Sequence, residues 1–334
     1  MSGTFLVRSG ILNSVHTFAN DPERGVFVLI FLSILILISV IIYFKYENFE
    51  KVNKSFFLSK ETAIIINNWF MMYFLAVVLI GTTYPIFLEV ITNEKISVGP
   101  PYFNQLIIPF LIPFLLVMAL GPKLDWIKNN KIETNLKKII LFILSVLISF
   151  LIAKYLNSKI LYLTVIISAG MYLFFVSIID LKNDKQKLSQ KISHLAFSIL
   201  ILSIILNSVF SEEVSVNLKN GEEKQVSKYL IKFKNISKSE INNYTSLKAE
   251  IGIIQKDDQL NFYPELRLYK VPETITSEAD IKTNLFSDNL VVVNYLKDTD
   301  YLNIRYQKKP FMLLIWFSAL LLGIGGLLGL RKNS

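Results

Sequence analysis

Cysteine is absent from this 334-residue sequence, and histidine occurs only twice, as His16 and His194. Without cysteine the chain forms no disulfide and offers no thiolate to a nucleophilic reaction or to zinc. Tryptophan is scarce too, and its three copies are isolated. There is no glycine-rich phosphate loop, no Ser–His–Asp arrangement and no carboxylate cluster in the apolar segments. We therefore predict no catalytic residues and take the two histidines as the strongest candidates for a functional role.

Long apolar runs dominate what is present. Hydrophobic residues make up 52% of the chain, and its mean hydropathy of +0.47 is too high for an ordinary soluble domain. A helix needs about 20 apolar residues to cross a bilayer. We find no N-terminal secretory signal, because the first apolar run follows a polar, Arg-bearing segment. Seven segments are predicted to span a membrane: Val26–Phe44, Ile64–Ile91, Gln105–Gly121, Lys138–Tyr155, Ile160–Asp180, Ile192–Phe210 and Pro310–Leu330.

The net charge of +9 follows the membrane topology rather than a nucleic-acid partner. Lysine and arginine gather after the first, third, fifth and last spans, and the intervening short loops carry few of them. This alternation is the positive-inside pattern, so we predict no nucleic-acid binding and only lipid contact for these charges. It places the N-terminus, the loop Thr92–Asn104 and the segment Ser211–Lys309 on the outer side of the membrane.

Ser211–Lys309 differs in character from the rest of the chain. It contains six short runs rich in β-branched and aromatic residues, which predict strands. Asn220-Gly221 indicates a hairpin turn. We expect a small β-sandwich or barrel inserted before the last helix. The strand predictions are Val214–Leu218, Tyr229–Phe233, Leu247–Ile254, Phe262–Tyr269, Leu290–Tyr295 and Tyr301–Tyr306.

The fold class predicted is thus an α-helical polytopic membrane protein with about seven transmembrane helices and a small extracytoplasmic β domain. Its parts are an outer-face segment over residues 1–25, a six-helix bundle over 26–210, the β domain over 211–309 and a last helix over 310–334. In that last helix Gly325 and Gly329 have the G-x-x-x-G spacing that permits close helix contact. Glu89 and Asp180 lie near span ends, where we expect interfacial solvation.

His194 lies close to the cytoplasmic end of the sixth predicted span, and His16 lies on the outer face. Neutral imidazole is a common axial ligand of haem iron. The alternatives are a helix-packing role for His194 and a solvated loop position for His16. The two are separated by most of a bilayer, about 30 Å, so they cannot share one haem. If both bind haem, they bind different haems, each completed by a ligand from outside this chain.

Arg8 and Arg24 flank His16 in the sequence. Guanidinium groups suit bidentate contact with carboxylates such as haem propionates. The predicted helix start at Asp21–Glu23 also offers free backbone N–H groups to an anion. Lipid-headgroup contact or simple solvation is the alternative for both arginines.

Two motifs resemble the CcmF family, the haem lyase subunit of the system I cytochrome c maturation machinery. They are Gly3–Pro22 (GTFLVRSGILNSVHTFANDP) and Lys95–Asn104 (KISVGPPYFN). His194 with Leu195 and Ala196, followed by the β domain and a Gly-rich last helix, is similar to the C-terminal half of that family. The resemblance covers essentially the whole chain.

The resemblance implies two haem b sites. His194 matches the second ligand of an intramembrane haem, and His16 matches the second of two histidines that flank a tryptophan-rich segment at the outer face. That segment and the first histidine of each pair do not occur here. The chain is therefore expected to be either the product of a split gene or a truncated sequence. The implied partners are the N-terminal half carrying the tryptophan-rich segment, the haem chaperone CcmE, apocytochrome c and its thiol-handling subunit CcmH.

The implied activity is that of part of a holocytochrome c synthase, which positions haem and keeps it reduced for thioether attachment to CxxCH thiols. The implied location is the bacterial inner membrane, with the N-terminus and the β domain in the periplasm; the mitochondrial inner membrane is the alternative. A non-catalytic assembly scaffold is a rival function. A transporter is a weaker rival, because the spans show no inverted repeat and no Gly/Pro-broken helices at matching positions.

Overall fold

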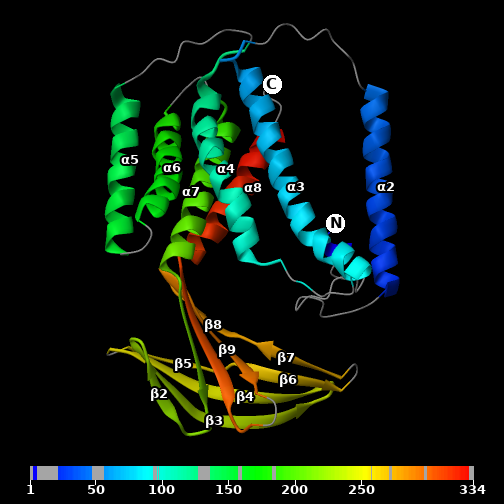
Figure 1. Ribbon diagram of the computed structural model, residues 1–334, viewed down its shortest axis with the longest axis vertical. Coiled ribbons are helices and arrows are strands. Elements are labelled where there is room, and N and C mark those ends of the chain that lie inside the picture. The colour runs from blue at the N-terminus through cyan, green and yellow to red at the C-terminus, as the bar shows by residue number, and fades with distance from the viewer. Residues whose placement is uncertain are drawn as a thin grey trace. The chain divides into compact units, whose positions relative to one another are not determined.

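A computed structural model describes residues 3–5, 22–46, 56–92, 96, 98–126, 136–156, 160–182, 186–256, 258–270, 273–296 and 299–330. Within these ranges seven helices are long and apolar enough to span a membrane (Figure 1). They are α2 (Pro22–Tyr46), α3 (Lys60–Thr92), α4 (Pro100–Leu120), α5 (Leu136–Tyr155), α6 (Ile160–Asp180), α7 (Leu188–Phe210) and α8 (Met312–Leu330).

Each predicted span corresponds to one helix, which confirms the transmembrane prediction. The helices begin earlier than predicted in several cases, most clearly in α4, which starts at Pro100 rather than Gln105. Proline suits the first turn of a helix because its missing N–H has no intrahelical acceptor there. The polar and basic residues at these ends carry the helix beyond its apolar stretch, which is why hydropathy alone places the ends too far inside.

The chain divides into two compact units, residues 1–144 and 145–334. In the first unit α3 contacts α4 through aromatic side chains, and Tyr73 Oη donates a hydrogen bond to Leu106 O at 2.9 Å. The rings of Phe70 and Phe74 both contact that of Phe114, which is buried. The second unit contains α6, α7, α8 and the β domain.

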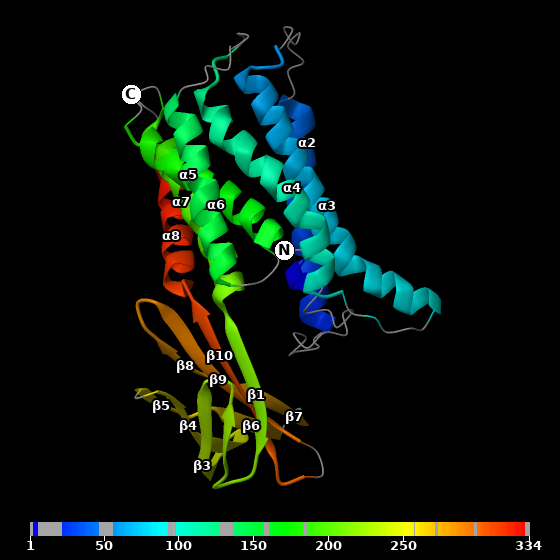
Figure 2. The same cartoon turned by 60° about the vertical axis from the view of Figure 1, so that its left-hand side comes forward.

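Two antiparallel sheets form the β domain (Figure 2). The smaller sheet has the order β1 (Glu212–Leu218), β10 (Leu302–Pro310), β9 (Ser287–Tyr295) and β8 (Asp280–Thr283). The larger runs β2 (Glu223–Val226), β3 (Tyr229–Ile241), β4 (Tyr244–Gln255), β6 (Glu265–Lys270) and β7 (Glu273–Glu278), and β5 (Asp258–Phe262) also pairs with β4.

Alternating apolar side chains from both sheets build one core. Val291 and Val293 on β9, Ile304 on β10 and Ile231 and Ile251 on the other sheet are fully buried. A strand turns successive side chains to opposite faces, so every second residue reaches this core. Burial of each such side chain contributes roughly 1.5–3 kcal/mol relative to exposure. The arrangement is a β-sandwich, one of the two architectures, sandwich or barrel, that the strand pattern predicted.

Three strands escaped prediction entirely, β5 was predicted only at its last residue, Phe262, and one predicted strand is interrupted. β2 and β7 are short and mostly exposed, so they lack the alternation of a half-buried strand. β8 has only four residues, and its one apolar side chain, Ile281, is on the exposed side. The run predicted as one strand over Phe262–Tyr269 breaks at Pro264 into the end of β5 and β6. Proline has no N–H for the ladder, which accounts for the break.

The Asn220-Gly221 turn forms, but the hairpin does not. Gly221 has φ +86°, a conformation that glycine adopts without steric cost. The strands on either side belong to different sheets, because β1 pairs with β10 and β2 pairs with β3. The turn therefore carries the chain from one layer of the sandwich to the other.

Candidate functional site

Of the predicted site residues, only His194 has a described side chain. His16 and Arg8 lie outside the described residues. Arg24 lies in α2, where the structure describes its backbone but not its side chain. His194 is six residues after the start of α7 and sixteen before its end. At a rise of 1.5 Å per residue it lies about 9 Å from the start and about 24 Å from the end that leads into the β domain. His194 and the β domain are thus at opposite ends of α7.

A seam of small residues holds α7 against α8. A Cβ built on Gly325 would collide with Ser193 Oγ and lie only 3.1 Å from Ser193 N. A Cβ on Gly329 would lie 3.8 Å from Ser189 Cβ. Glycine lets the two backbones approach to this distance, which confirms the close contact predicted from the G-x-x-x-G spacing. The two helices run side by side in Figures 1 and 2.

The opposite face of α7 contacts α6. A Cβ added to Gly170 on α6 would lie 3.5 Å from Ile205 Cδ1 and 3.7 Å from Leu202 Cδ1. Successive helical residues are rotated by about 100°, so His194 stands beside the Ser193 seam and toward the α6 side. It is half-buried there. Contacts with helices on both sides therefore fix the backbone that carries the imidazole.

The imidazole of His194 makes no hydrogen bond within the part of the chain described. Asp180 at the end of α6 interacts electrostatically with it. Only 8% of Asp180 is exposed, so the expectation of interfacial solvation was wrong for this residue. Asp180 is the last residue of α6, which packs against α7, so the residue is covered although it lies at the end of a span. The one indication in the sequence was an ionisable group in an apolar span, which marks a functional candidate.

This arrangement fits a single axial ligand of a metal cofactor. A half-buried imidazole without an internal hydrogen-bond partner has a ring nitrogen to offer to iron. A nearby carboxylate is the kind of group that orients the ring of a ligating histidine. No group of three or more His, Asp and Glu side chains that could hold a metal ion occurs among the described residues.

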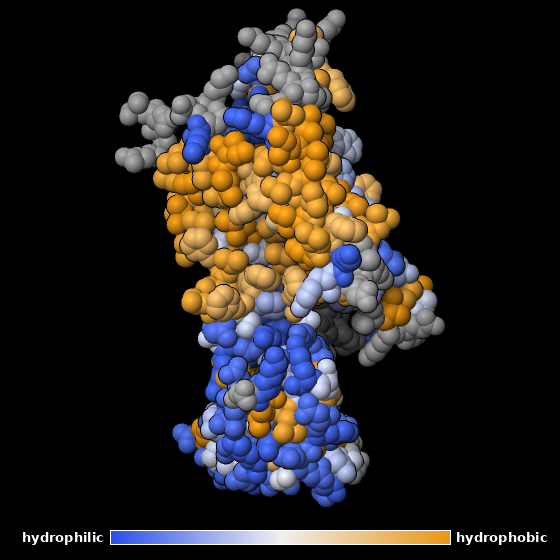
Figure 3. Space-filling view, turned by 90° about the vertical axis from the view of Figure 1, so that its left-hand side faces the viewer, coloured by the Kyte–Doolittle hydropathy of each residue, from blue (hydrophilic) through white to orange (hydrophobic). Residues whose placement is uncertain are grey.

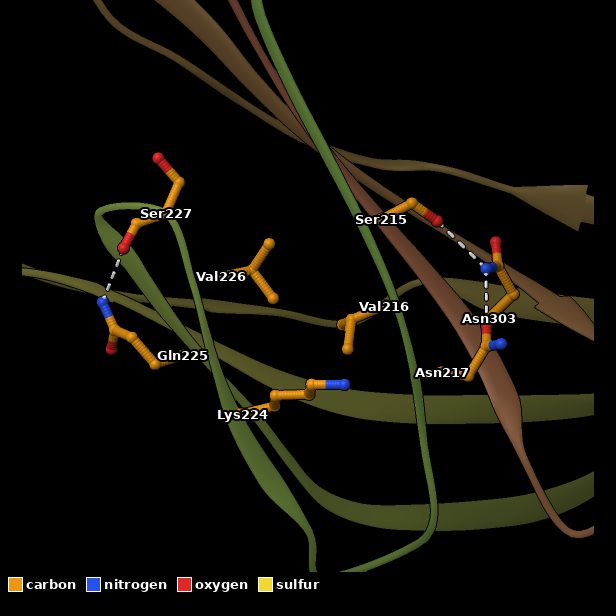
Figure 4. A pocket seen from close by; sticks show the side chains of 8 residues that line it. All are labelled: Ser215, Val216, Asn217, Lys224, Gln225, Val226, Ser227 and Asn303. Carbon is orange, nitrogen blue, oxygen red and sulfur yellow. Dashed lines mark hydrogen bonds between the residues drawn. The ribbon is translucent and has the colours of Figure 1, made fainter.

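The β domain offers a shallow polar pocket of about 570 Å³ between the ends of β1 and β2 (Figure 4). Asn303 Nδ2 donates to Ser215 Oγ at 3.0 Å and to Asn217 Oδ1 at 2.7 Å, so its amide protons are already used. Lys224 is the one charged side chain in the lining. The pocket has no pair of groups for acid–base or nucleophilic chemistry.

A polar network occupies the part of the β domain next to α7. Glu212 accepts a hydrogen bond from Tyr229 Oη at 2.6 Å and one from Lys228 Nζ at 2.6 Å. Burial would raise the pKa of Glu212, but these two donors outweigh it and hold that pKa below its usual range. Burial raises the pKa of Tyr229, and its bond to the Glu212 anion raises it further. Burial also raises the pKa of Tyr306 to about 12. The tyrosines stay neutral, which suits a structural network.

The sequence is similar to those of known proteins over nearly its whole length. The family model described as CcmF C-terminal beta-sandwich matches residues 209–310. The chain is 32% identical to the cytochrome c-type biogenesis protein CcmF of Pseudomonas fluorescens, over 97% of this chain and 51% of that protein. It is 28% identical to CcmF of Escherichia coli K12, over 98% and 52%. The chain thus spans about half the length of the curated relatives it matches.

A solved structure has a similar fold. The structure named Cytochrome c Heme Lyase CcmF matches with a TM-score of 0.65 and 18% identity, over 83% of this chain and 46% of that one. At this identity the likeness concerns the fold.

Proposed function

We propose that this chain, which corresponds to the C-terminal half of a CcmF-type protein, acts in cytochrome c biogenesis as part of a haem lyase. The relatives are named for that process, and the similar structure is named a haem lyase. The observation that carries the proposal is His194, a half-buried imidazole on a transmembrane helix with no hydrogen bond inside the described chain.

In this proposal His194 is one axial ligand of a haem b in the membrane. A bound haem would supply one-electron redox chemistry. The chain's own part is to hold the ligand: the Gly325–Ser193 contact fixes α7 on one side, and the α6 contact fixes it on the other. Asp180, which is buried and interacts electrostatically with the imidazole, would help to orient the ring of the ligating histidine. The second axial ligand comes from residues beyond this sequence.

A second haem b site at the outer face is part of the same proposal. His16 is its axial ligand, and Arg8 and Arg24 contact the propionates. The partner there is the N-terminal half with its tryptophan-rich segment, and the wider set is CcmE, CcmH and apocytochrome c. The chain matches 51% and 52% of the two relatives, and the N-terminal half proposed as partner corresponds to the part of them that it does not match.

The location proposed is the bacterial inner membrane, with the N-terminus and the β domain in the periplasm. The alternating lysine-rich loops support this orientation. The relatives named above are bacterial. Labelling of single cysteines introduced on either side, in this cysteine-free chain, tests the orientation directly.

The decisive experiment is co-expression with the tryptophan-rich half, purification of the complex and a reduced-minus-oxidised haem spectrum. We expect a b-type signal that His194→Ala removes and that added imidazole restores, because free imidazole can occupy the vacated position. Gln190→Ala is the matched control: it lies one turn earlier on the same side of α7 and should keep the signal. An undiminished signal in purified His194→Ala complex would contradict the ligand role.

A second measurement separates the haem lyase from a scaffold that only assembles its partners. His16→Ala should abolish cytochrome c maturation while the complex still assembles and co-purifies. If maturation persists at the normal level in that variant, the scaffold function is the better description.

A further inference from the structure

The turn between β8 and β9 presents two large apolar side chains to the outside of the β domain. Thr283 pairs with Asp288, and the four residues between them form the turn. Asn284 N donates to Ser287 O at 3.0 Å, while Asn284 Oδ1 accepts hydrogen bonds from the backbone N–H of Phe286 and of Ser287. These bonds fix the turn, so its tip is a defined feature of the fold.

Leu285 and Phe286 at this tip are 77% and 82% exposed. Both lie well away from the core of the sandwich, which is complete without them. Two adjacent large apolar side chains held out on a rigid turn are unfavourable in water and mark a surface that something covers.

The tip lies level with the ends of two transmembrane helices. Phe311 N donates to Phe286 O at 3.0 Å, and Phe311 is followed at once by α8. Asn207 Nδ2 near the end of α7 donates to Pro310 O at 2.5 Å, and the rings of Phe210 and Phe311 are 6.3 Å apart. Figure 2 shows the β8–β9 hairpin beside the start of α8. The tip therefore lies beside the ends of α7 and α8 that join the β domain.

We propose that Leu285 and Phe286 insert into the lipid interface and form a third point of attachment of the β domain to the membrane, besides α7 and α8. The exposed apolar surface of α8 continues from the same level, with Leu313, Leu314 and Trp316 all exposed. Figure 3 shows apolar side chains gathered over the helices and hydrophilic ones over the β domain. The bilayer is the apolar phase that begins at this level.

Lipid insertion has a structural consequence for the domain. The chain crosses between β domain and membrane twice, at Ser211 and at Phe311, and these two crossings are adjacent. Two adjacent crossings alone leave the domain able to tilt about them. An anchored turn on the next hairpin removes part of that freedom and sets the face that the sandwich presents to partners.

Site-specific fluorescence tests the proposal, since the chain has no cysteine. Phe286→Cys in the full chain is labelled with an environment-sensitive fluorophore and reconstituted into phosphatidylcholine nanodiscs, with or without lipids that carry a shallow nitroxide quencher. Tyr295→Cys is the matched control. It is 57% exposed and stands at the other end of β9, nine residues and therefore about 31 Å from Phe286 at 3.4 Å per residue.

We expect the label at position 286 to be quenched by the nitroxide lipids and protected from aqueous iodide, and the label at position 295 to behave in the opposite way. Iodide quenching at 286 equal to that at 295 would overturn the proposal, because the tip would then be in water. Protection of 286 from both quenchers would overturn it too, because a protein surface would then cover the tip. Leu285→Cys repeats the test, and both exposed positions tolerate replacement without loss of core contacts.

Discussion

Replacing Gly325 with alanine places one methyl group in the seam between α7 and α8. The added Cβ would collide with Ser193 Oγ and lie 3.1 Å from Ser193 N and 3.3 Å from Ser193 Cα. The hydroxyl can rotate away, but the two backbone atoms move only if the helices separate. The substitution therefore forces α8 away from α7 at the position next to His194.

The same helix provides internal controls. Nothing lies within 4 Å of a Cβ added to Gly323 or to Gly326. All three substitutions gain the same helix propensity, about 1 kcal/mol. The difference between Gly325→Ala and Gly323→Ala therefore isolates the steric term, which for overpacking is about 1–3 kcal/mol. At 1.4 kcal/mol per tenfold, this is about a 5-fold to 150-fold change in the unfolding equilibrium constant.

Unfolding in mixed micelles, followed by helical circular dichroism, measures these differences. We expect Gly325→Ala to be less stable than Gly323→Ala and Gly326→Ala, which should match each other. Ser193→Ala combined with Gly325→Ala should recover only part of the loss, because the backbone contacts remain. Equal stability of Gly325→Ala and Gly323→Ala would refute the close approach of the two helices. In the haem-loaded complex, Gly325→Ala should also reduce the b-type signal, since Ser193 adjoins His194.

Three further predictions concern Asp180, the sandwich core and the Glu212–Tyr229 pair. Asp180→Asn should weaken haem binding at His194 by about tenfold in a titration of the two-chain complex, with unchanged membrane insertion; unaltered binding would remove the carboxylate from the site. Ile304→Ala should destabilise the β domain by about 2–5 kcal/mol and Ile304→Val by about 1 kcal/mol, because this side chain is fully buried; hydrogen exchange of β-domain amides in the full chain measures both. The lowered pKa of Glu212 means that its stabilising effect is present above its unfolded value of 4.5 and is lost as pH falls through the lower folded value. The raised pKa of Tyr229 means that stability is lost as pH rises above its unfolded value of 10.0. Glu212→Gln should flatten the acid side of the exchange profile, and an unchanged profile would contradict the pair.

Much of the fold could be predicted because its cause is local. A run of about 20 apolar residues must become a helix in a bilayer, since no water is there to bond its backbone groups. The sequence likewise predicted the strands that have one face in the core and the other in water, because their apolar and polar residues alternate. These are β1, β3, β4, β9 and β10. Strands β2 and β7 show no such pattern, because most of their side chains are exposed, and in β8 the only apolar side chain, Ile281, faces out of the core.

Some features of the candidate site could also be predicted from the sequence, and others could not. Rarity and position in an apolar span were enough to single out His194, and the four-residue spacing was enough to pair Gly325 with Gly329. The burial of Asp180 was not predictable, because it arises from the way α6 meets α7. The position of the exposed Phe286 beside the start of α8 was not predictable either. It depends on the hydrogen bond between Phe311 N and Phe286 O, which joins residues distant in the sequence.

The sequence by itself determined which segments enter the membrane, where the β domain is inserted and which histidine lies on a transmembrane helix, because these follow from hydrophobicity and chain order. The tertiary structure alone decided which neighbours surround each of those residues. Gly323, Gly325 and Gly326 are alike as sequence, yet only Gly325 meets another backbone. Asn220-Gly221 specifies a turn, but the two strands that it joins pair with other strands, β1 with β10 and β2 with β3. Strand pairing depends on which faces are buried in the core of the sandwich, and a local sequence pattern does not determine that.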